Sequence, residues 1–154
     1  MRLKPVVAAA LLAAAVAAWN HPAWAFGGGS STSEEFEAGQ KAVDAKDYES
    51  AVKHLTAAVA EDSENADAEN LLGFAHRKLG HHDEAQKHYW KALKLDPDHK
   101  GAHEYLGEAY LELKNLGKAE GQLAELKRLC PSGCTELATL QSAIDAYKKA
   151  NPGS

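Results

Sequence analysis

Hydrophobic residues recur every three or four positions along most of the chain, which is the spacing of one buried face of an α-helix. In the middle of the sequence the first such run consists of Ala68, Leu72, Ala75 and Leu79. Residues 80–83 (GHHD) interrupt it, and a second run follows at Ala85, Tyr89, Ala92 and Leu93. This pattern predicts two helices of about thirteen residues joined by a short turn.

The two-helix unit repeats along the chain with a period of 34 residues. Small residues repeat at Gly39, Gly73 and Gly107 and at Ala51, Ala85 and Ala119. Larger ones repeat at Leu55, Tyr89 and Leu123, and each unit ends at Ser63, Pro97 or Pro131. A fixed period of this length is typical of a solenoid of stacked helical hairpins. The small residues let the two helices of one hairpin approach closely, and the prolines end each second helix.

The repeated motif resembles the tetratricopeptide repeat family. The third unit carries the motif as His103-x2-Leu106-Gly107-x2-Tyr110, Ala119-x3-Leu123 and Pro131. The second unit carries it as Leu72-Gly73-x2-His76, Ala85-x3-Tyr89 and Pro97. The first unit carries it as Ala38-Gly39-x2-Ala42, Ala51-x3-Leu55 and Ser63. Where the family often has tryptophan, this chain has Glu35, Glu69 and His103, which leaves less apolar contact between hairpins. The resemblance implies an all-α, right-handed solenoid.

The repeat boundaries divide the chain into three units and a final helix. The units span residues 32–65, 66–99 and 100–133. Residues 134–150 carry a single apolar stripe, Leu137, Leu140 and Ile144, and predict a capping helix over the open end of the stack.

The first 25 residues have the pattern of a secretory signal peptide. Arg2 and Lys4 precede an apolar run over residues 6–18, and Ala23-Trp24-Ala25 supplies a small-residue cleavage site. A run of thirteen residues is about 20 Å long as a helix, shorter than a membrane core. We expect cleavage after Ala25, a flexible leader over residues 26–31, and a periplasmic or secreted mature chain without a membrane span; a retained anchor is the alternative.

The family resemblance also implies a binding site. Members bind peptides or partner proteins on the concave face, which the first helix of each repeat lines. By matching positions, the groove residues are Phe36, Gln40, Val43, Asn70, Phe74, Arg77, Lys78, Glu104, Glu108, Leu111 and Glu112. We expect Phe36 and Phe74 to be exposed apolar anchors. We expect a basic patch at Arg77 and Lys78 and an acidic stripe in the third repeat to orient the partner. The acidic stripe consists of Glu104, Glu108 and Glu112. The alternative is that Phe36 contacts the leader, that Phe74 is half covered and that the charges are merely solvated.

Two cysteines and seven histidines follow the predicted cleavage site. Cys130 and Cys134 flank a Pro-Ser-Gly turn and predict a structural disulfide in an oxidising compartment. A carrier of copper, zinc or thiol redox equivalents, which uses this motif and histidines, is the rival function. The histidines are expected to be solvated or half-buried, without a metal site, and Trp90 to be half-exposed on the convex side.

The remaining sequence features argue against catalysis and nucleic-acid binding. The chain has 45% hydrophobic and 25% charged residues, as a globular protein does, and a net charge of −5, which disfavours nucleic acid. It has no glycine-rich phosphate loop, nucleophile elbow or zinc-protease motif. We therefore predict a non-enzymatic protein-interaction module without a cofactor. One role for such a module is as a scaffold or assembly factor for an envelope component, and self-association through the first repeat is a further alternative.

Overall fold

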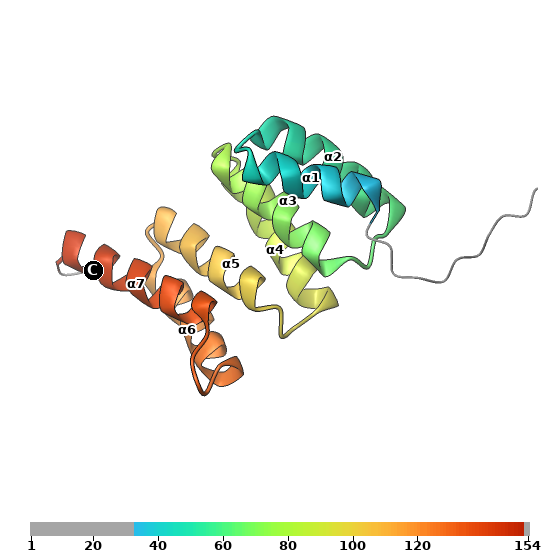
Figure 1. Ribbon diagram of the computed structural model, residues 1–154. Helices are drawn as coiled ribbons and strands as arrows, with labels where there is room; N and C mark the ends of the chain where they lie inside the picture. The colour runs from blue at the N-terminus through green and yellow to red at the C-terminus, as the bar shows by residue number, and fades with distance from the viewer. Residues whose placement is uncertain (1–32, 153–154) are drawn as a thin grey trace, which may run out of the picture. The chain divides into compact units, whose positions relative to one another are not determined.

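The computed structural model describes residues 33–152, and the predicted signal peptide and leader lie outside this range. All regular secondary structure in this range is α-helical (Figure 1). The helices are α1 (Glu34–Asp44), α2 (Tyr48–Glu61), α3 (Ala66–Lys78), α4 (His82–Leu95), α5 (Lys100–Glu112), α6 (Leu116–Leu129) and α7 (Thr135–Ala150). None of the described helices has the length and hydrophobicity that a membrane crossing requires.

The helices pair in chain order into three antiparallel hairpins, and α7 packs against both α5 and α6. Each hairpin turn contains a left-handed residue at the same position of the repeat: Lys46, Gly80 and Lys114, with φ of 60°, 80° and 58°. Only glycine adopts this conformation without steric cost, so the second turn is the least strained of the three.

Close helix contact inside the hairpins explains the repeated glycines. A Cβ atom on Gly39 would lie 2.6 Å from the Leu55 side chain, and one on Gly73 would lie 2.8 Å from the Tyr89 ring. The third repeat differs, because a Cβ atom on Gly107 would lie 2.6 Å from Leu140 of α7. The capping helix therefore enters the space that the third glycine leaves open.

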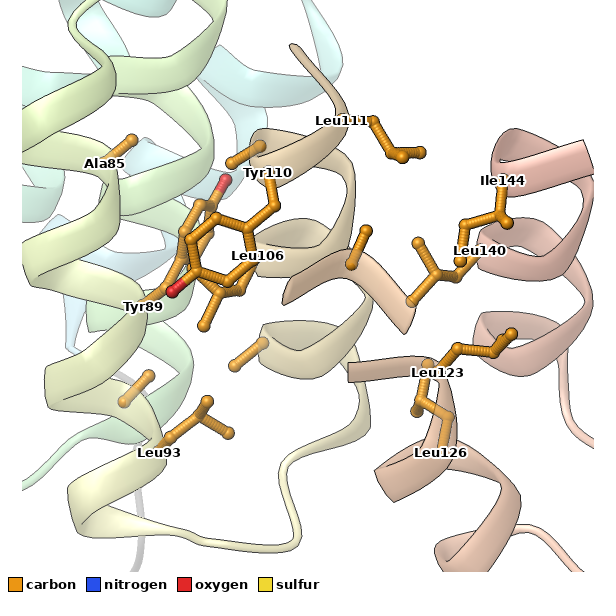
Figure 2. Close-up of a cluster of buried hydrophobic side chains, with 14 residues drawn as sticks. Ala85, Tyr89, Leu93, Leu106, Tyr110, Leu111, Leu123, Leu126, Leu140 and Ile144 are labelled. Carbon is orange, nitrogen blue, oxygen red and sulfur yellow. The ribbon is translucent and has the colours of Figure 1, made fainter. Parts of the chain in front are cut away.

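Buried hydrophobic side chains form two clusters along the stack. One joins α1, α2 and α3, and the other joins α4 to α7. Figure 2 shows the second cluster, in which Tyr89, Leu106 and Tyr110 fill the space between α4 and α5. Leu140 and Ile144 of α7 lie in the same cluster and are fully buried, so α7 covers the apolar side of the last hairpin.

Polar pairs occupy the position where related repeats often have tryptophan. Glu35 Oε2 lies 2.7 Å from His54 Nδ1, and Glu69 Oε2 lies 2.7 Å from His88 Nδ1. In the third hairpin His103 Nδ1 lies 2.7 Å from Gln122 Oε1. Each pair joins the first helix of a hairpin to the second helix 19 residues later. A repeated hydrogen bond thus takes the place of an aromatic contact.

Candidate functional site

Five of the predicted groove residues of the second and third repeats line a shallow cavity between α3, α5 and α7. The cavity has a volume of about 310 Å³ and is lined by Arg77, Lys78, Glu108, Leu111, Glu112 and Ala143. The lining comes from two repeats and the capping helix, so the cavity exists only when the hairpins are stacked.

A row of aromatic rings runs beside this cavity. The Phe74 ring centroid is 4.9 Å from that of Tyr105 and 6.1 Å from that of Tyr48. Phe74 and Tyr105 are both half-exposed, and Lys78 Nζ lies 5.1 Å from the centroid of the Phe74 ring. The arrangement offers an apolar platform with a cation at its edge. Sequence reasoning identified Phe74 but missed Tyr48 and Tyr105.

The signal that could have identified Tyr105 is its position in the repeat. It lies 34 residues after Leu71, directly beside the predicted groove residue Glu104. Matching repeat positions alone does not show which residues of two neighbouring first helices face each other. A comparison of those facing residues would have placed Tyr105 against Phe74 across the interface between repeats.

Arg77 is not the open basic group that the sequence predicts. Its side chain is 3% exposed and donates hydrogen bonds to Glu108 Oε2 at 2.6 Å and Glu112 Oε1 at 2.8 Å. Its guanidinium carbon also lies 5.6 Å from the Phe74 ring centroid and 5.8 Å from that of Tyr105. The predicted basic patch and acidic stripe therefore neutralise each other across the α3–α5 interface, and Lys78 alone of the two cations is exposed.

Two further groove predictions fail for the same reason, because the side chains pack inside the stack. Phe36 is 4% exposed and belongs to the first core cluster, so it is not a surface anchor. Asn70 is buried as well. Leu111 belongs to the second cluster but also lines the cavity, as predicted. Val43 is half-buried against the first cluster, whereas Gln40 and Glu112 are exposed.

Glu104 is the most perturbed carboxyl group of this face. Partial burial raises its pKa to about 7, and the nearby carboxylates of Glu108 and Glu136 act in the same direction, while Arg77 opposes them. Glu104 is therefore only partly ionised near neutral pH.

The raised pKa of Glu104 predicts a pH-dependent stability difference. Because the folded state favours the protonated acid, its stabilising contribution is complete below the ordinary pKa of 4.5 and is lost as pH rises through about 7. Glu104→Gln keeps a neutral side chain at every pH. At pH 8 we expect Glu104→Gln to be more stable than the wild type by about 1 kcal/mol, a value that takes account of solvent screening. At pH 4.5 we expect the two proteins to have similar stability.

Urea unfolding of both proteins at the two pH values measures this difference. Glu61→Gln, which changes an exposed carboxylate at the end of α2, is the control for the loss of one carboxyl group. An equal stability of Glu104→Gln and wild type at pH 8 would contradict the prediction.

The cysteine motif connects α6 to α7. Cys130 follows α6, Cys134 is the N-cap of α7, and the two form a disulfide with their Cα atoms 5.7 Å apart. Trp90, on α4, is 52% exposed. Within residues 33–152 no group of three or more His, Cys, Asp or Glu side chains could hold a metal ion.

The repeat motifs match known families. Two tetratricopeptide repeat models match residues 42–89 and 71–133, and together they span residues 42–133. The chain belongs to the tetratricopeptide repeat (TPR) family. Its fold is accordingly the all-α TPR solenoid that the 34-residue period predicts.

Solved TPR domains have the same architecture. The TPR2B domain of yeast Sti1, in a pHsp70 complex, is similar with a TM-score of 0.70 and 19% identity, over 77% of this chain and 96% of that one. The second TPR domain of human RPAP3, in complex with the HSP70 peptide SGPTIEEVD, has a TM-score of 0.64 and 26% identity, over 72% of this chain and 92% of that one.

Curated relatives match a shorter segment. The DnaJ protein P58IPK homolog A of rice (Oryza sativa subsp. japonica) is 42% identical over 73 residues, which are 47% of this chain. The match spans 14% of the length of the rice protein, so the likeness covers only a small part of that protein.

Proposed function

We propose that this chain is an exported, non-enzymatic TPR module that binds a peptide segment of a partner protein in the groove between α3, α5 and α7. The observation that carries this proposal is the half-exposed Phe74–Tyr105 platform beside the 310 Å³ cavity. Aromatic side chains that remain accessible next to a cavity are typical anchors for a bound chain.

The contacts of the groove indicate what kind of segment fits. An apolar side chain of the partner packs on the rings of Phe74 and Tyr105, which lie 4.9 Å apart. Lys78 is the exposed cation of the site and pairs with a carboxylate of the partner. Arg77 is held by Glu108 and Glu112, so it fixes the shape of the groove wall and does not need to find a new partner.

The RPAP3 domain supports a peptide ligand, since that TPR domain was solved with an HSP70 peptide bound. Export is supported by the signal-peptide pattern of residues 1–25 and by the joined cysteines, because disulfides persist in oxidising compartments. A role as scaffold or assembly factor for an envelope component follows from location and binding together. N-terminal sequencing of the chain from a periplasmic fraction should begin at Phe26.

Phe74→Ala tests the groove. Proteins that cross-link to the wild-type chain in a periplasmic extract are identified, and peptides from them are titrated against purified variants. Removal of the Phe74 ring is expected to weaken peptide binding by at least about tenfold, as loss of a central aromatic anchor does. Lys78→Glu, at an exposed position, should weaken the binding of acidic peptides without a change in fold.

Trp90→Ala is the matched control, because it removes an exposed aromatic side chain from α4, outside the groove lining. Circular dichroism confirms that each variant is folded. Peptide affinities that are unchanged in both Phe74→Ala and Lys78→Glu, or that fall only in Trp90→Ala, would contradict the proposal.

A further inference from the structure

Trp90 is a large apolar side chain that is exposed on the face formed by the second helices α4 and α6. It is 52% exposed, and the other exposed large hydrophobic residue among residues 33–152, Leu113, follows the end of α5. At the same position of the repeat, the first and third repeats have the smaller residues Thr56 and Ala124. The repeat framework therefore does not require an aromatic ring here.

Two shallow cavities flank the indole of Trp90. The second cavity has a volume of about 310 Å³ and is lined in part by Trp90, Leu93, Gln122 and Arg128. Because both cavities share Trp90 and Gln122, they form one elongated surface, which we call the Trp90 surface. The first cavity has a volume of about 410 Å³ and is lined by Gln86, Trp90, Tyr110, Lys118, Gly121 and Gln122.

The first cavity contains a glycine that helix packing does not require. Gly121 lies in the interior of α6, and a Cβ atom there would meet no other atom within 4 Å. The first and second repeats have Lys53 and Lys87 at this position. Glycine inside a helix is unfavourable relative to alanine, because it loses more conformational freedom on folding. A local rule broken in this way is typical of functional positions.

Neighbouring side chains hold the polar groups of this surface in place. The side chains of Trp90 and Tyr110 form a hydrogen bond. Since an indole N–H can only donate, the Tyr110 hydroxyl oxygen accepts, and its own O–H can donate to a ligand. The Gln122 amide lies 2.7 Å from Nδ1 of His103, whose Nε2 lies 3.0 Å from the Pro97 carbonyl oxygen. The indole and the Gln122 amide are therefore oriented before a ligand binds.

Lys118 gives the first cavity an uncompensated positive charge. Its Nζ lies 5.2 Å from the centroid of the Tyr110 ring, and the ion pairs within residues 33–152 do not include it. The lining of this cavity contains no acidic side chain. In the second cavity Arg128 is already paired with Asp98 and Glu125. A ligand with a negative charge therefore finds its partner in the first cavity.

We propose that the Trp90 surface binds an acidic oligosaccharide. A sugar ring has an apolar C–H face that stacks on an exposed indole, and its hydroxyl groups form hydrogen bonds with amide and hydroxyl groups. Trp90 contacts the ring face, and Gln86 and Gln122 bind the hydroxyl groups. Lys118 pairs with the carboxylate of an acidic sugar. The two cavities hold sugar residues on either side of the indole.

The polar surroundings of Trp90 favour a sugar over a protein segment. The core of a protein interface is depleted of charged residues. Lys87 and Lys94 are exposed on α4 three and four residues from Trp90, on the same side of the helix. The first cavity has no aliphatic residue in its lining, whereas the groove cavity has Leu111 and Ala143. One aromatic face among polar groups suits a sugar ring, which has one apolar face and a polar edge.

Isothermal titration calorimetry of the full chain tests the proposal with three acidic oligosaccharides, namely trigalacturonate, trimannuronate and a hyaluronan tetrasaccharide. We expect at least one to bind with a dissociation constant of about 1 mM or below. Neutral galactotriose should bind about fivefold more weakly at low salt, the effect of one exposed ion pair. The indole N–H signal of Trp90 in nitrogen-15 NMR, assigned by its absence from Trp90→Ala, should shift on binding.

Gly121→Leu is the decisive variant, because its side chain fills the open space of the first cavity without a clash. Oligosaccharide affinity is expected to fall at least about tenfold. Thermal stability should be maintained or increased, since leucine favours a helix more than glycine does. Gly117→Leu is the matched control, at another open position of α6 outside both cavity linings, and should leave the affinity unchanged. Lys118→Gln should lower the affinity for the acidic oligosaccharide to that for the neutral one.

Two results would overturn the proposal directly: no binding of the three acidic oligosaccharides at about 10 mM, or equal affinity in wild type and Gly121→Leu. An acidic peptide of aspartate, glutamate and phenylalanine is titrated in parallel. If it shifts the Trp90 signal at a lower concentration than any of the sugars, the surface binds a protein segment and the assignment is wrong. Peptide binding in the groove is measured separately with Phe74→Ala, so failure of one proposal does not affect the other.

Discussion

Tyr89→Ala is expected to lower the free energy of unfolding by about 3–5 kcal/mol, the range for truncating a large buried aromatic side chain. Tyr89 is fully buried, and its ring contacts Gly73 of its own hairpin and lies among the side chains of α5 (Figure 2). Because Gly73 has no side chain, position 73 of α3 offers no atoms to fill the cavity. Urea unfolding followed by circular dichroism measures the loss.

Tyr89→Phe separates the ring from its hydroxyl group. Tyr89 Oη is buried without a hydrogen bond of good geometry among the described residues, so its removal should change stability by less than about 1 kcal/mol. Tyr89→Leu, which installs the residue found at Leu55 and Leu123, should lie between the two. A loss in Tyr89→Phe as large as in Tyr89→Ala would show that the hydroxyl group, not the packing of the ring, holds the hairpins together.

The fold could be predicted because its determinants repeat. The columns of Gly73, Ala85 and Tyr89 keep residues of similar size every 34 positions, so the spacing along the chain carries the information, even though Gly107 packs against α7 and Tyr89 also packs against α5. The capping helix could be predicted in the same way, since the stripe with Leu140 and Ile144 is local.

The site could be predicted less well because its contacts join different repeats. The charges of Arg77 and Glu108 were both noted in the sequence, but their 31-residue separation hides that they neutralise each other. Phe36 was predicted to be a surface anchor because matching repeat positions were assumed to face the groove in every repeat. In the structure this ring lies in the first buried cluster.

Arg77→Met is expected to destabilise the protein by about 2 kcal/mol and to change the chemistry of the groove. The substitution keeps apolar volume between Phe74 and Tyr105 but removes the cation that bridges Glu108 and Glu112. Loss of one partner from a fully buried ion pair costs about 3–5 kcal/mol. The cost here is smaller, because the Glu108 and Glu112 side chains are 24% and 41% exposed and remain hydrated.

The groove carboxyl Glu104 provides a second readout of Arg77→Met. Arg77 lowers the pKa of Glu104 against the effects of burial and of Glu108. Without Arg77 the pKa of Glu104 should rise above about 7, which carbon-13 NMR titration of the glutamate carboxyl groups can follow. Arg77→Lys retains the positive charge but cannot donate to both carboxylates with the planar guanidinium geometry. It should therefore restore the pKa of Glu104 more fully than the free energy of unfolding. If Arg77→Met changes neither the stability nor the Glu104 titration, the ion pairs between α3 and α5 do not organise the groove. Lys78 and the aromatic platform alone would then have to account for any binding.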